Sequence, residues 1–242
     1  MSYAYSDSFF DYVTRINSYS ATRITSLLAS TITVRSVLDV GCGPGLWLSA
    51  WRERGARDLL GIDGAYVDRG RLRISPEEFE SRDLGFPFRV DRKFDLVQSL
   101  EVAEHLPPSR AESFVADLAA HGGLVLFSAA PPGQGGENHV NERPYEYWRR
   151  LFSRLGYEVF DFIRPLVRDD TRVAPWYRYN TLLFADTSRA ESLPESVRLT
   201  RLAQDASVPD VSPWSYRVRK RLIRTMPFWV RQELAKAKSA LA

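Results

Sequence analysis

An acidic residue followed by three alternating glycines is the part of this chain best suited to chemistry. Asp39 stands in an apolar run that ends at Val40, and Gly41, Gly43 and Gly45 follow. Glycine lets the backbone turn sharply and removes the Cβ atom where a flat, bulky ligand approaches. A dinucleotide turn would space its glycines as Gly-x-Gly-x-x-Gly, and this chain does not. The segment predicts a nucleotide-type binding turn without a pyrophosphate, with a purely structural turn as the alternative.

Polar residues at the ends of later apolar runs extend this pattern. Asp63 follows the glycines by about 20 residues, where an acid accepts hydrogen bonds from ribose hydroxyls. Asp83 and Leu84 stand in a turn, and the run Phe94–Leu106 contains Ser99 before it becomes polar. Parallel strands present such residues at one edge of a sheet, so we expect them to share one site.

These four segments resemble, in the same order, the motifs of the class I S-adenosylmethionine-dependent methyltransferases. The resemblance covers residues from about 35 to 185. It implies S-adenosyl-L-methionine as the cofactor, with the glycine-rich turn at the methionine part, Asp63 at the ribose, and Asp83 with the following backbone amide at the adenine. The cofactor-binding residues expected on this basis are Asp39, Gly41, Gly43, Gly45, Asp63, Asp83, Leu84 and Ser99.

Histidine and glutamate side chains provide candidates for the reaction itself. His139 lies in the Pro- and Gly-rich loop 128–144, which we expect on the active face. Imidazole, with a pKa of about 6.5, suits removal of a proton from an acceptor hydroxyl. His139, His105 and Glu101 are the predicted catalytic residues. The alternatives are a loop-ordering hydrogen bond for His139, a structural role for His105, a solvated helix-start acid for Glu101, and a helix cap for His121.

A metal site is the alternative use of the same groups. The pattern Glu-x-x-Glu-His with a later histidine resembles that of small-RNA 3′-terminal 2′-O-methyltransferases, in which it binds a divalent ion. Carboxylate and imidazole ligands are reasonable for Mg²⁺ or Mn²⁺. Our main prediction contains no metal, and the alternative ligands are Glu101, Glu104, His105 and His139.

Composition and hydrophobic patterning predict the scaffold. The chain has 242 residues and is 44% hydrophobic, enough for one sizeable core. Short apolar runs alternate with helical patterns, which predicts an α/β fold with a Rossmann-like, doubly wound seven-stranded sheet, mostly parallel with an antiparallel last strand. The expected strands are 36–41, 58–63, 79–83, 94–100, 122–129, 157–163 and 180–185, with no clear helix before the last. The expected helices include 8–30, one after Gly45, 109–120 and 144–155.

Four regions are expected along the chain: an N-terminal helical segment (1–34), the methyltransferase domain (35–185), a polar linker (186–213) and a basic tail (214–242). With only Cys42, no apolar run of about 18 residues and no signal-like N-terminus, we expect a cytoplasmic protein.

The tail differs in charge from the remainder of the chain. Residues 214–242 hold eight Lys or Arg and one acid, so their charge is +7; because the whole chain is +3, residues 1–213 carry −4. Trp214, Val218 and Leu222 fall at helical spacing beside arginines. Such a helix is typical of contact with an anionic membrane surface, and packing on the protein's own domain is the alternative. Nucleic acid is a less favoured partner because the acidic domain would repel phosphate.

The function predicted from these residues is O-methylation, dependent on S-adenosylmethionine, of a hydroxyl on a sugar-containing or natural-product small molecule or a glycan. A metal-dependent RNA 2′-O-methyltransferase is the alternative enzyme. A non-enzymatic cofactor-binding scaffold is the alternative outside catalysis.

Overall fold

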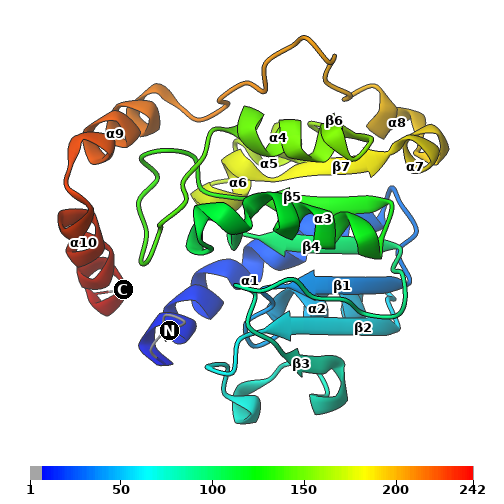
Figure 1. The fold of residues 1–242 in the computed structure, drawn as a ribbon, viewed down its shortest axis with the longest axis horizontal. Coiled ribbons are helices and arrows are strands. Elements are labelled where there is room, and N and C mark those ends of the chain that lie inside the picture. Colours follow the sequence, from blue (N-terminus) through cyan, green and yellow to red (C-terminus); the bar gives the residue numbers. More distant parts are fainter. Residues whose placement is uncertain (1–6, 242) are drawn as a thin grey trace.

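The computed structural model describes residues 7–241 and confirms the expected α/β architecture (Figure 1). Seven strands form one sheet in the order β3-β2-β1-β4-β5-β7-β6. Strands β1 to β5 pair in parallel, and β7 runs antiparallel to both β5 and β6, as expected for the last strand. The strands are β1 (Ser36–Val40), β2 (Asp58–Asp63), β3 (Phe79–Ser81), β4 (Leu96–Leu100), β5 (Leu124–Ser128), β6 (Tyr157–Phe160) and β7 (Leu182–Asp186).

Two hydrophobic clusters fill the two faces of the sheet, because successive residues of a strand point to opposite sides. Val37 belongs to the cluster under the first two helices, and its neighbour Leu38 to the cluster under the next two. These helices are α1 (Asp7–Ala29) and α2 (Leu46–Glu53) on one face, and α3 (Ala111–His121) and α4 (Tyr145–Arg154) on the other. Burial on both sides explains why the parallel strands read as unbroken apolar runs.

The region between the last two strands differs from the sequence prediction. The sixth strand ends at Phe160, and two short helices, α5 (Ile163–Val167) and α6 (Pro175–Asn180), follow where no clear helix was expected. Pro165 lies within α5 and Pro175 begins α6, so neither helix is long enough to show a helical period. The expectation of a direct return between the two strands was therefore wrong, although the antiparallel pairing is confirmed.

The C-terminal part is helical and leaves the sheet. It consists of α7 (Thr187–Ser192), α8 (Glu195–Arg198), α9 (Trp214–Thr225) and α10 (Phe228–Leu241). Helices α9 and α10, coloured orange and red in Figure 1, lie beyond the loop 131–144, and α10 packs against α1. Among the described helices, none combines the length and apolar character needed to cross a membrane.

Candidate active site

A cavity of about 1530 Å³ opens at the carboxyl ends of β1, β2 and β4. The chain leaves β1 toward one side of the sheet and β4 toward the other, and ligands of open α/β sheets bind at such a switch point. The lining is drawn from within residues 39–46, 63–66, 81–86, 100–107 and 134–140, together with Asn17, Trp176, Tyr177 and parts of α9 and α10.

The glycine-rich turn takes the backbone conformation that only glycine adopts easily. Gly41, Gly43 and Gly45 have φ values of 84°, 50° and 83°. A Cβ atom would lie 2.3 Å from Val102 Cγ2 at the first of these positions and 2.9 Å from Ile74 Cγ1 at the third. Gly45 also lies outside the cavity lining. The missing Cβ atoms at Gly41 and Gly45 therefore make room for the protein's own side chains, which corrects the expectation that they make room for a ligand.

Asp39 presents a buried carboxylate to the cavity floor. The residue is 2% exposed, and its Oδ2 atom has no hydrogen-bond partner among the described residues. Burial raises the pKa of Asp39 to about 8, because a low-dielectric environment disfavours the charged form. An orphaned carboxylate oxygen in a binding cavity is suited to a cationic group of a ligand.

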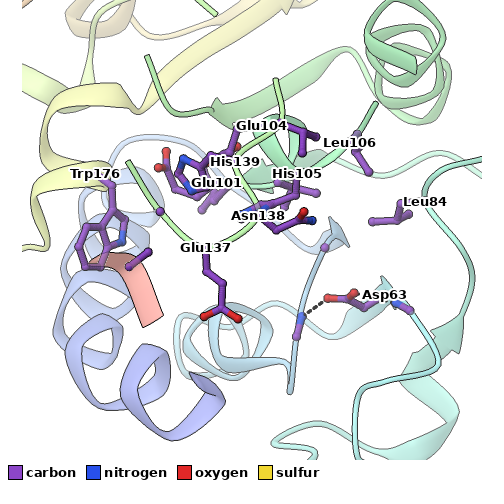
Figure 2. Close-up of a pocket in the computed structure, with 18 of the residues that line it drawn as sticks. Asp63, Leu84, Glu101, Glu104, His105, Leu106, Glu137, Asn138, His139 and Trp176 are labelled. Carbon is purple, nitrogen blue, oxygen red and sulfur yellow. Dashed lines mark hydrogen bonds between the residues drawn. The ribbon is translucent and has the colours of Figure 1, made fainter. Parts of the chain in front are cut away.

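Asp63 is the last residue of β2, and its carboxylate connects the glycine-rich turn to that strand. Its Oδ2 accepts a hydrogen bond from Gly43 N at 2.6 Å, shown as a dashed line in Figure 2, and its Oδ1 accepts from Gly64 N at 2.7 Å and from the Tyr66 hydroxyl. Burial raises the pKa of Asp63. An ionised carboxylate accepts about four hydrogen bonds, so one position is left for a ligand.

Asp83 and Leu84, the residues predicted at the adenine, lie in the cavity lining, whereas Ser99 does not. Asp83 and Leu84 both line the cavity, and Asp83 Oδ1 accepts from Gly85 N at 2.9 Å. Ser99 lies in β4 with its side chain fully buried and is absent from the lining. In a strand buried on both faces, only the last residues reach the cavity, and in β4 these are Leu100 and the adjoining Glu101.

Glu101 begins the opposite wall of the cavity. Its φ of 58° is unusual for a residue with a side chain and marks strain at the end of β4. The carboxylate accepts hydrogen bonds from Gln134 Nε2 at 2.6 Å and Asn180 Nδ2 at 3.1 Å. Burial raises the pKa of Glu101, and these amides partly oppose the shift. Two amide donors hold Glu101 in place, which favours a positioning role over proton transfer.

Burial shifts the pKa values of Glu104 and His105 in opposite directions, each toward the neutral form. Glu104 is fully buried, and neither carboxylate oxygen has a hydrogen-bond partner among the described residues. Burial, reinforced by the charge of Glu101, raises the pKa of Glu104 well above its usual range. Burial, reinforced by His139, lowers the pKa of His105 to about 3. The Glu104 carbonyl also accepts from the backbone amides of residues 140 and 141, which fixes the histidine-bearing loop against β4.

His139 is oriented by Glu142, a residue that the sequence interpretation did not include. His139 Nδ1 donates a hydrogen bond to Glu142 Oε1 at 3.1 Å, which leaves Nε2 as the nitrogen that can accept a proton. The same carboxylate accepts from the backbone amides of Gly133 and Gly135, both at 2.8 Å. A Cβ atom at Gly136 would lie 2.1 Å from His139 Nε2, so any other residue at that position would clash with the imidazole ring.

The side chains of His105 and His139 are in contact in the cavity wall. The ring centroids of His105 and His139 are 4.8 Å apart and the rings are nearly perpendicular. Figure 2 shows Glu101, Glu104 and both histidines gathered on one side of the pocket, with Asp63 on the other. One ligand atom from each of Glu104, His105 and His139 falls within 4.8 Å of the others, a spacing that fits a metal ion. Glu101, the fourth alternative ligand, is not part of that group.

The aromatic side chains divide into two pairs. Trp176 and Tyr177 line the cavity, where aromatic faces are suited to stacking on a ring of a ligand. Trp148 is buried in the core and Tyr147 packs beside it, so these two do not reach the cavity. His121 ends α3, where its Nδ1 donates to the Asp117 carbonyl at 2.6 Å, in agreement with a structural role.

Residues 12–168 match the family model described as a methyltransferase domain. Because the match spans more than half of the chain, the chain belongs to this family of methyltransferase domains. The resemblance to class I S-adenosylmethionine-dependent methyltransferases is thereby confirmed.

Curated relatives are ubiquinone biosynthesis O-methyltransferases. That of Alkalilimnicola ehrlichii is 33% identical over 132 residues, which is 51% of this chain and 48% of the relative. That of Stutzerimonas stutzeri is 31% identical over 146 residues, 54% of this chain and 59% of the relative. The chain thus spans about half the length of the curated relatives it matches.

Solved structures share the fold at low sequence identity. DesVI of Streptomyces venezuelae has a TM-score of 0.56 and 16% identity, covering 74% of this chain and 96% of that one. CalS10, an amino pentose methyltransferase from Micromonospora echinaspora with S-adenosylmethionine bound, has a TM-score of 0.53 and 17% identity, covering 77% and 99%. These likenesses confirm the Rossmann-like methyltransferase fold.

Proposed function

We propose that this protein transfers a methyl group from S-adenosylmethionine to a hydroxyl of a sugar-containing or natural-product small molecule or a glycan. The observation that carries the proposal is a histidine oriented by a carboxylate, His139 with Glu142, in the same cavity as the glycine-rich turn. The names of the curated relatives support O-methylation, and the sugar-modifying neighbours support the acceptor class.

The floor of the cavity suits the cofactor. The unpaired Asp39 oxygen can accept the α-ammonium group of the methionine part, and the remaining acceptor position of Asp63 can take a ribose hydroxyl. Asp83 and the backbone at Leu84 lie where the adenine edge would be recognised. When bound, the cofactor supplies an electrophilic methyl group on a positively charged sulfur.

The opposite wall suits the acceptor. A bound cofactor would supply the methyl group, and the acceptor hydroxyl would give its proton to His139 Nε2 as its oxygen is methylated. In the neutral imidazole, Glu142 fixes the proton on Nδ1 and so leaves the lone pair on Nε2, and its negative charge stabilises the imidazolium that forms. On the same side, burial shifts the pKa values of Glu104 and His105 toward their neutral forms.

Binding of S-adenosylhomocysteine tests the proposal directly. We expect the wild-type protein to bind it in calorimetry, and Asp63→Ala to weaken binding by about 1–3 kcal/mol because ribose hydrogen bonds and the fastening of Gly43 are lost. Asp68→Ala, at an exposed acid outside the cavity lining, is the matched control. Binding of a nicotinamide dinucleotide without binding of S-adenosylhomocysteine would refute the assignment.

A metal-dependent RNA 2′-O-methyltransferase is the second candidate. The three-ligand group of Glu104, His105 and His139 supports it. Neither Glu104 oxygen has a hydrogen-bond partner within the part of the chain that the structure describes, which fits either a bound cation or a protonated acid. A scaffold without catalysis is less supported, because Asp39, Asp63 and the His139–Glu142 pair are all in place.

We also propose that α9 and α10 contact an anionic membrane surface. Trp214 and Trp229 are 74% and 69% exposed, and Arg217, Arg221 and Arg224 of α9 are exposed as well. We expect the protein to sediment with vesicles that contain phosphatidylglycerol, and replacement of the three arginines by serine to abolish this, since each contributes on the order of 1 kcal/mol.

The vesicle experiment has a matched control that removes the same charge elsewhere. Serine at the exposed Arg54, Arg57 and Arg168 should leave sedimentation unchanged. Equal losses in both triple variants, or no effect of high salt, would show that the tail is no membrane contact.

A further inference from the structure

The C-terminal helices are fixed over the cavity by a strap, residues 199–213, that is itself held by buried arginines. Arg149 donates to the carbonyls of Ala203 and Ala206, and Arg164 donates to the carbonyl of Pro209 at 2.9 Å. Near the end of the strap, Asp210 pairs with the buried Lys220 of α9 at 2.5 Å. The polar stretch expected as a linker is thus packed on the domain.

Both C-terminal helices contact the loop that carries the candidate catalytic histidine. Arg219 donates to the Gln134 carbonyl at 3.1 Å, and Asn138 N donates to the Gln232 side chain at 2.7 Å. Arg231 of α10 lies 3.5 Å from the carboxylate of Glu142. The position of α9 and α10 is therefore coupled to the loop at residues 134–142, next to the reacting groups.

The inner side of these helices is an apolar wall of the cavity. The wall residues are Leu222, Ile223, Met226, Leu234 and Ala235. Leu222 and Leu234 are 59% and 53% exposed, so apolar surface faces open space inside the cavity. The cavity also exceeds the 300–1,000 Å³ or so of common small-molecule sites, and the cofactor motifs account for only the opposite end.

We infer that α9 and α10 form the acceptor-binding wall, and that the methyl acceptor carries an apolar portion that packs on Leu222, Ile223, Met226 and Leu234. This inference rests on the proposed function, because it takes the acceptor hydroxyl to lie at His139. The wall is continuous with that residue across loop 134–140, so an acceptor held there by its hydroxyl extends its remaining part along the wall. These helices lie outside the matched methyltransferase domain, as expected for an element that sets acceptor specificity.

A series of 4-alkylphenols from methyl to octyl, used below their micelle concentrations, tests the wall by calorimetry with and without S-adenosylhomocysteine. We expect affinity to rise about two- to fourfold per methylene, because each buried methylene is removed from water. The double variant L222S/L234S should flatten this dependence and weaken octylphenol binding by about tenfold or more. Both side chains are more than half exposed, so the variant is expected to fold.

Two controls separate the possible outcomes. Leu199→Ser changes a leucine that is 78% exposed and lies outside the lining, and Trp229→Ser changes the outer surface of α10; neither should alter the chain-length dependence. A flat dependence in the wild-type protein, or equal effects of the control variants, would overturn the inference even if S-adenosylhomocysteine binds. Failure of S-adenosylhomocysteine to bind would instead overturn the proposed function.

Discussion

Replacing His139 by alanine is expected to lower turnover by about 10²- to 10⁴-fold while cofactor affinity stays nearly unchanged. The side chain lies on the wall opposite Asp63, so its removal leaves the cofactor-binding groups intact. Turnover is measured with labelled cofactor and a panel of hydroxylated acceptors, and cofactor affinity by calorimetry with S-adenosylhomocysteine. Leu166→Ala, at an exposed position outside the cavity lining, is the control and should keep its activity.

Glu142→Gln gives a second measurement of the same pair. Loss of the carboxylate charge removes both the control of the His139 tautomer and the stabilisation of its imidazolium, so we expect turnover to fall by roughly 10²-fold. Full activity of the alanine variant would leave His139 with a structural role. Loss of activity on chelation, restored by Mg²⁺ or Mn²⁺, would favour the metal site at Glu104, His105 and His139.

The sheet and the cofactor end of the cavity could be predicted because their signals are local. Each parallel strand is a short apolar run, and the acids Asp39 and Asp63 directly mark the ends of two of them. Parallel pairing then places both acids at one edge without further information. Ser99 was the exception: it precedes the last residue of β4 and its side chain is fully buried, whereas the cavity lining begins at Leu100.

The acceptor end could be predicted only in part because its contacts are not local. His139 was recognisable as an imidazole in a rigid loop, whereas Glu142 is an acid in a segment without helical or strand period, and nothing in its spacing shows that it bonds Gly133 and Gly135. The amphipathic pattern of the tail predicted a helix but not which surface it faces. Trp214, expected on the apolar stripe, is 74% exposed.

The amphipathic pattern of the tail had two interpretations, contact with a membrane surface and packing on the protein's own domain, and the two need not exclude each other. Ile223 lines the cavity, whereas Trp229 is exposed and lies outside the cavity lining. A helix pair that is both an inner wall and an outer contact surface would bring an acceptor with an apolar portion to the cavity from a membrane surface.

Affinity for S-adenosylhomocysteine is expected to rise with pH from 6 to about 8, by up to about tenfold per unit, and to lose this dependence in Asp39→Asn. Burial raises the pKa of Asp39 to about 8, so the side chain is mostly protonated at neutral pH in the free protein. An α-ammonium group beside Oδ2 favours the charged form and lowers that pKa, so binding releases a proton at pH values between the lowered pKa and about 8. At higher pH the free-energy cost of deprotonating Asp39 on binding becomes smaller, so affinity for S-adenosylhomocysteine increases with pH.

The proton release is measured by calorimetry at pH 7 in buffers of different ionisation enthalpy. We expect close to one proton for the wild-type protein and a small fraction of one for Asp39→Asn, whose affinity at pH 8 should fall by about 10- to 100-fold because a hydrogen bond between charged groups is lost. Asp83→Asn, at an exposed acid of the same cavity, should keep the pH dependence. Asp63 faces the same floor and also has a raised pKa, so Asp63→Asn is measured in parallel. A dependence that survives in Asp39→Asn and disappears in Asp63→Asn would move the cation-binding role to Asp63.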